Sequence, residues 1–145
     1  MWIDHDAMVL VADGRKMLLF RNKGDRTVPN LEAETVKLQD NPYDRDQSTD
    51  VSGRAPSITG GQATMGKTDY HEQEEMRFAI EATDLLKRRA LANDFEKLII
   101  VAPPTALGEM RKHYHKEVQS RLVGEIAKDL ANHPVPEIER IIAQS

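Results

Sequence analysis

The chain has 145 residues, a length that suits one domain able to bury a core of its own. Acidic residues outnumber basic ones by 24 to 20, and the net charge of −4 argues against binding nucleic acid through bulk positive charge alone. The chain has no cysteine, which excludes disulfides, thiolate metal sites and cysteine nucleophiles.

Three β-strands are expected in the N-terminal part. Residues 7–12 form a buried apolar run, and residues 17–20 form a second one after Asp13-Gly14. Asp-Gly between two such runs is typical of a hairpin closed by a type I′ turn. Residues 35–38 are the third expected strand, whose beginning Pro29 makes irregular.

A long loop, which we expect to be flexible, follows over residues 40–68. It contains four glycines and two prolines among many Ser, Thr and Asp residues. Its length is unusual for a compact domain, where such loops are usually functional or lack a fixed structure.

A helix is expected to begin at Thr68 or Asp69, because Glu72 can complete a capping box with Asp69. Phe78 and Ala82 belong to its apolar face, which repeats with helical spacing. The pattern predicts that this face packs on the sheet.

The C-terminal part alternates strands and helices. Residues 97–102 read as a buried parallel strand, 105–115 as a helix, 121–126 as a strand with a helix as the alternative, and 136–143 as a closing helix with Ile138, Ile141 and Ile142 inward. The order predicts one domain over residues 1–145, of the α/β class. Its mixed sheet would have three antiparallel N-terminal strands followed by βα units, as in ribonuclease H-like domains and the middle domain of the archaeal and eukaryotic class-one release factor.

Several stretches resemble the family known as "protein required for attachment to host cells". They are Val11-Ala12-Asp13-Gly14-Arg15, residues 68–79 with their His-Glu helix start, residues 98–104 ending in Pro-Pro, and Lys128-Asp129-Leu130. That family is grouped with bacterial relatives of the release-factor middle domain. The resemblance therefore implies a release-factor-like fold and a phenotype in host attachment.

The tripeptide Gly60-Gly61-Gln62 resembles the catalytic tripeptide of release factors, which lies in a loop after the antiparallel strands and before a long helix. There the glycines let the backbone approach an ester bond and the glutamine positions a water. The resemblance implies hydrolysis of peptidyl-tRNA, with Gly60, Gly61 and Gln62 as catalytic residues. The chain departs from the release-factor pattern because it has no room for a decoding domain. A loop that contains these three residues by chance is the alternative.

Asp69, His71 and Glu72 are a second candidate site, on the surface of the expected helix. With Glu75 they could bind a metal, but a well-capped helix start explains the same acids, and we favour that interpretation. His113 and His115 are two apart and point in different directions on a helix, so they do not chelate together. We expect neither a metal nor a cofactor, since no P-loop or dinucleotide-binding motif occurs.

Asp13 ends the first strand, where a ribonuclease H-like nuclease has a metal-binding acid, but its Asp-Gly turn already explains it. The basic residues of the first hairpin and of the next two helices form either a face for RNA or, as we favour, an ordinary solvated surface. They are Arg15, Lys16, Arg21, Lys23, Lys87, Arg88, Arg89, Arg111 and Lys112.

The acidic N-terminal residues and the lack of an apolar run near ~20 residues indicate a cytoplasmic protein with no membrane partner. Two functions are favoured over a third, a metal nuclease. The first is a translation-associated factor that contacts the ribosome or tRNA through a hydrolytic Gly-Gly-Gln loop. The second is a non-catalytic binding module that affects attachment to host cells. Whether the chain is an enzyme depends on that choice.

Overall fold

Five strands form a mixed sheet. The computed structural model describes the backbone of residues 1–38 and 60–145 and the side chains of residues 1–34 and 73–145. The strands lie in the order β3-β2-β1-β4-β5, and their bounds are β1 Met8–Ala12, β2 Lys16–Asn22, β3 Leu31–Leu38, β4 Leu98–Ala102 and β5 Leu122–Ala127. The β1–β2 and β2–β3 pairs are antiparallel, whereas β1–β4 and β4–β5 are parallel. The expected α/β class, with three antiparallel strands followed by βα units, is confirmed.

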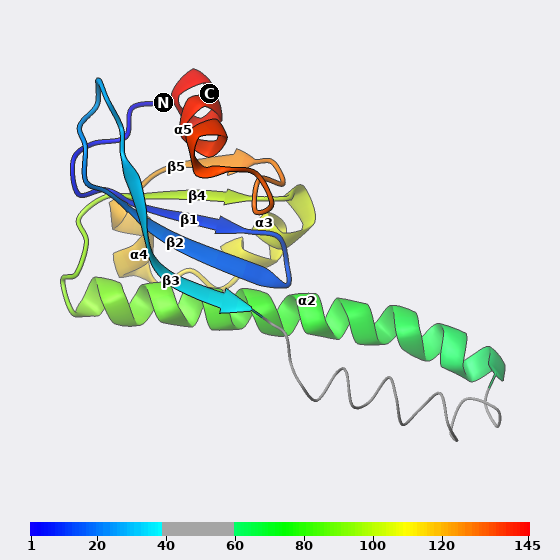
Figure 1. The fold of residues 1–145 in the computed structure, drawn as a ribbon. Coiled ribbons are helices and arrows are strands. Elements are labelled where there is room, and N and C mark those ends of the chain that lie inside the picture. The colour runs from blue at the N-terminus through cyan, green and yellow to red at the C-terminus, as the bar shows by residue number, and fades with distance from the viewer. Residues whose placement is uncertain (39–59) are drawn as a thin grey trace.

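Helices cover both faces of the sheet (Figure 1). The first face packs against α2 (Gly60–Leu91), α3 (Pro104–Arg111) and α4 (Lys116–Arg121), and the second against α5 (Val135–Gln144). Among the residues that the structure describes, no helix is long and apolar enough to cross a membrane.

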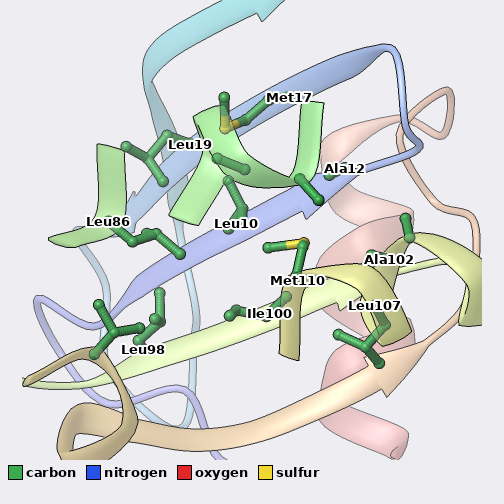
Figure 2. Packing of buried hydrophobic residues seen from close by; sticks show 14 of the residues in the cluster. Leu10, Ala12, Met17, Leu19, Leu86, Leu98, Ile100, Ala102, Leu107 and Met110 are labelled. Atoms are coloured by element: carbon green, nitrogen blue, oxygen red, sulfur yellow. The ribbon is translucent and has the colours of Figure 1, made fainter. Parts of the chain in front are cut away.

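The core is divided by the sheet into two clusters. Along β1, Met8, Leu10 and Ala12 face the first cluster, and Val9 and Val11 face the second, as the two-residue period of a strand requires. All five are fully buried because β1 is a central strand with helices on both sides. Figure 2 shows the first cluster, where side chains of α2 and α3 meet those of β1, β2 and β4.

The β1–β2 hairpin forms as expected, but its turn type differs from the prediction. Asp13 and Lys16 pair across the turn, which makes Gly14 and Arg15 its central residues. Gly14 has φ +100, and Arg15 has no positive φ. Positive φ at the first central position alone is the pattern of a type II′ turn, so the prediction of type I′ is wrong. The Asp13 side chain stabilises the turn by accepting hydrogen bonds from the Arg15 and Lys16 backbone N–H groups at 2.9 and 2.8 Å.

Helix α2 begins earlier than the sequence indicated. It starts at Gly60, so residues 60–68 of the predicted loop are helical and Thr68 and Asp69 do not cap its start. The chain has no proline between Pro56 and Pro103. A helix nucleated in the strongly packed 78–90 region can therefore extend toward its N-terminus with one hydrogen bond gained per residue. The rest of the expected loop, residues 40–59, lies outside the described residues.

The C-terminal elements follow the prediction with one correction. The helix expected over 105–115 ends at Arg111, and a second short helix, α4, follows it. Residues 122–127 are a strand, as we favoured, and α5 turns Ile138 and Ile142 into the core with Ile141 packed beside them.

Candidate functional site

The tripeptide Gly60-Gly61-Gln62 forms the first turn of α2 and is not in a loop before it. The tripeptide follows the three antiparallel strands in the chain, as the resemblance implies. Its setting differs from the prediction because it lies inside the helix and not in a loop before it. The Gln62 side chain lies outside the described side chains.

The start of α2 projects away from the body of the domain. The C-terminal half of this helix lies along the sheet, and its N-terminal half extends past the strands (Figure 1). Among the α2 side chains that the structure describes, from Gln73 on, the first buried one is Phe78. The β1–β2 turn reaches the helix at Glu75, whose Cγ is 4.0 Å from where a Cβ on Gly14 would be. At about 1.5 Å per residue, Gly60 is about 22 Å beyond Glu75 along the axis.

Asp69, His71 and Glu72 lie within α2, two turns or more from its first residue. Their capping role is ruled out by the longer helix. Their side chains lie outside the described ones, and a metal at this position stays a prediction that nothing here tests.

The basic residues singled out in the sequence are largely neutralised by acids. Arg21 and Arg89 both bind Glu34 and Asp94, while Lys87 and Arg88 both bind Asp84, Arg111 binds Glu125 and Lys112 binds Glu109. These six cations therefore do not form an unpaired basic face. The interpretation as an ordinary solvated surface fits all of them except Arg21, which is buried.

Arg21 belongs to a network that joins two cations and two acids. Its Nε donates to Glu34 at 2.8 Å, its NH2 group lies 3.3 Å from Asp94, and Arg89 lies 3.0 Å from each of the same two acids. Strand β3 has a register shift opposite Leu19 and Phe20, where Glu34 is the extra residue. A bulge re-aims a side chain in this way. The Arg21 guanidinium lowers the pKa of Glu34 below its ordinary value through this hydrogen bond.

A second charged site, which the sequence did not reveal, lines the same cleft as Arg21 and Asp94. The Asp4 carboxylate accepts hydrogen bonds from Arg26 and Lys97, which lower its pKa to about 2. These residues come from the N-terminal segment, the β2–β3 turn and the position just before β4. Because they are far apart in the chain, no local motif announces them.

A buried asparagine holds that site together. Asn22 is fully buried, and its Nδ2 donates to the carbonyls of Ile3 and Asp4 at 2.8 and 3.1 Å. Its Oδ1 accepts from the backbone N–H groups of Gly24 and Asn30 at 2.9 and 2.8 Å. One side chain thus fixes the N-terminal segment against the β2–β3 turn.

Comparison with known proteins agrees with the release-factor part of the resemblance. A relative in Rickettsia prowazekii (strain Madrid E), the uncharacterized protein RP470, is 25% identical over 138 residues, which cover 93% of this chain and 91% of the relative. The role in host attachment stays a prediction. The model of a release-factor family matches residues 6–142, nearly the whole chain. The chain belongs to bacterial archaeo-eukaryotic release factor family 12.

Proposed function

We propose that this protein is a translation-associated factor that contacts the ribosome or tRNA and uses Gly60, Gly61 and Gln62 to hydrolyse the ester bond of peptidyl-tRNA. The observation that carries the proposal is the tripeptide in the first turn of a projecting helix, in a chain of a release-factor family. A tip that projects from the domain can reach a substrate that lies inside a large assembly.

The chemistry follows from the backbone of a helix start. The first four N–H groups of a helix have no partner within the helix, and they carry partial positive charge. Two glycines have no side chains to keep the ester away from these donors. The donors would stabilise the oxyanion that develops on the ester carbonyl.

Gln62 would orient the attacking water. Water adds to the ester carbonyl, the bond to the ribose oxygen breaks, and the peptide leaves with a free carboxyl group while the tRNA regains its hydroxyl. Because the glutamine amide does not titrate, Gln62 itself cannot act as the base. The proton transfers would fall to groups of the ribosome and the tRNA.

The test measures peptide release from purified ribosomes that carry peptidyl-tRNA. We expect Gln62→Ala to slow release by about tenfold or more, because a misplaced water loses most of the benefit of orientation. Gln73→Ala is the matched control, since Gln73 is an exposed glutamine on the same helix. Equal release by the Gln62 variant and the wild type would contradict the proposal.

Gly61→Ala separates catalysis from helix stability. Alanine favours a helix by about 1 kcal/mol over glycine, so this variant should keep or increase the helical content. The added methyl group would nevertheless hinder the ester, and release should fall. If release instead follows helical content, the tripeptide acts only through structure.

The second candidate is a binding module without catalysis that affects attachment to host cells. Co-sedimentation with ribosomes at several salt concentrations distinguishes the two functions. Absence of association even at low salt would favour the binding module, because contacts with rRNA strengthen as salt falls.

A further inference from the structure

We propose that a pocket formed by the N-terminal segment, the β2–β3 turn and the β4–β5 edge of the sheet binds single-stranded RNA, one or two nucleotides at a time, by stacking a base on Trp2. This inference rests on the proposed function in its choice of RNA over other anions. The site itself is distant in the chain from Gly60, Gly61 and Gln62, and it can be tested alone.

The pocket combines an aromatic platform with apolar walls. Its volume is about 340 Å³, within the size range of small-ligand sites, and Trp2, Ile99 and Val123 line it. Trp2 is 65% exposed and Val123 is 50% exposed, which is unusual for large apolar side chains. The described part of the chain thus offers a stacking surface that no neighbouring residue covers fully.

Two cations, Arg26 and Lys97, also line this pocket. The Arg26 side chain is 57% exposed and that of Lys97 is 49% exposed, whereas the Asp4 carboxylate between them is only 19% exposed. The acid therefore lies below the two cations, and the group has one excess positive charge. Solvent meets mainly the positive groups, which complement a phosphate.

The geometry is fixed before any ligand arrives. The Arg26 guanidinium lies 5.9 Å from the centroid of the Trp2 ring, a cation–π distance. Asn22 joins the segment that contains Trp2 and Asp4 to the turn that contains Arg26 through its four hydrogen bonds. Preorganised aromatic and cationic groups lose little entropy when they bind.

Single-stranded RNA is the occupant that these features favour. Base stacking on an aromatic side chain, beside cations that contact the backbone, is how proteins bind single strands without reading sequence. An adjoining open cleft contains the carboxylates of Asp6, Asp25 and Glu96. These would repel further phosphates, and this repulsion limits the site to one or two nucleotides.

The experiment uses the intrinsic fluorescence of Trp2, the chain's only tryptophan. Titration of the full chain with hexauridylate RNA should quench this fluorescence. The apparent affinity should fall by about sevenfold between roughly 50 and 200 mM salt, as expected for two phosphate contacts on a single strand. A 5′-phosphorylated dinucleotide, which has two phosphates, should bind nearly as well as the hexanucleotide.

Variants are compared by the anisotropy of fluorescein-labelled hexauridylate. Trp2→Leu, which keeps an apolar residue but removes the stacking surface, should weaken binding about tenfold. Lys97→Ala should weaken binding and reduce the salt dependence. Lys112→Ala is the matched control because Lys112 is also an exposed, ion-paired lysine, and it lies outside the pocket, directly after α3. Far-UV circular dichroism verifies that each variant is folded.

Three results would overturn the inference: Trp2→Leu binding as well as the wild type, no quenching at low salt, or equal competition by polyglutamate, which would indicate an acidic-peptide site instead. The two proposals fail separately. Gln62→Ala should bind hexauridylate with wild-type affinity, and a chain that releases peptide without binding hexauridylate would refute only the RNA site.

Discussion

Replacing Arg21 with methionine tests how much the buried ion network contributes to stability. Arg21→Met keeps an unbranched apolar stem and removes only the guanidinium. The Arg21 side chain is 10% exposed, and it also donates to the Asp6 carbonyl at 3.3 Å. The variant therefore removes one donor from each of two acids, Glu34 and Asp94, and the donor to the Asp6 carbonyl.

The expected loss is about 2–3 kcal/mol of unfolding free energy. Removing one partner of a buried ion pair typically costs about 3–5 kcal/mol, because the remaining charge is uncompensated. The cost should be lower here for two reasons. Glu34 and Asp94 are 27% and 42% exposed, and each still contacts Arg89.

The assay is urea unfolding followed by far-UV circular dichroism, at pH 7 and at several lower pH values. The pKa of Glu34 is lowered in the folded state, chiefly by its hydrogen bond from Arg21. The stability that this shift provides is present above the ordinary pKa of about 4.5 and is lost as pH falls through the lowered value. The difference between wild type and Arg21→Met should therefore be largest at pH 7 and shrink below about pH 4.5.

Arg88→Ala is the control for this experiment. The Arg88–Asp84 pair is exposed, at 63% and 47%, and spans one helical turn, so its loss should cost only about 0.3–0.5 kcal/mol. The reasoning is refuted if Arg21→Met is as stable as the wild type. Such a result would show that desolvation of Arg21 cancels everything its ion pairs contribute.

Two other changes have clear expected outcomes. Gly24→Ala should lower stability by about 1–3 kcal/mol in thermal melts, because a Cβ there would clash with the Val28 carbonyl and lie 2.8 Å from the Asn30 backbone nitrogen. Gly108→Ala, in open space within α3, should instead gain about 0.5–1 kcal/mol, and equal effects at both positions would contradict this. Asp4→Asn should flatten the acid end of the stability profile. The wild type loses the contribution of Asp4 as pH falls from about 4 toward its folded pKa of about 2, and an unchanged profile would refute the assignment.

The central strands were predictable because their signal is local. The continuous apolar runs that became β1 and β4 are buried on both faces, which only a covered central strand allows. The inward side of α5 was likewise readable from its isoleucines. In these elements, sequence spacing and tertiary burial favour the same structure.

Other features were not predictable because they depend on distant residues. The start of α2 differs from the prediction because Asp69 and Glu72 match a capping box within a longer helix. No proline lies between Gly60 and Asp69 to end the helix there. Helix α4 is six residues long and capped by the His115 side chain, which accepts from the Glu117 backbone N–H group. Histidine is not a usual capping residue. Val118 is the one buried residue of α4, so the helix has no repeating apolar positions that would predict it.

The sites divide in the same way. Gly60-Gly61-Gln62 is contiguous, so the sequence could propose it, although its helical setting emerged only with the fold. The Asp4–Arg26–Lys97 group joins three separate segments through Asn22, and no spacing rule predicts such an assembly. The bulge that turns Glu34 toward Arg21 likewise has no sequence pattern that would predict it.

The projecting N-terminal half of α2 moves whenever the packed C-terminal half tilts on the sheet, because both belong to one helix. If the helix tilts by about 3° where it rests on the sheet, Gly60 moves by about 1 Å, because about 22 Å of helix lies beyond Glu75. A displacement of that size can change a reaction rate by about a hundredfold. The packing of Phe78, Ala82 and Leu86 against the sheet thus sets the position of Gly60. Small repacking mutations at these residues should shift the tripeptide without changing its sequence.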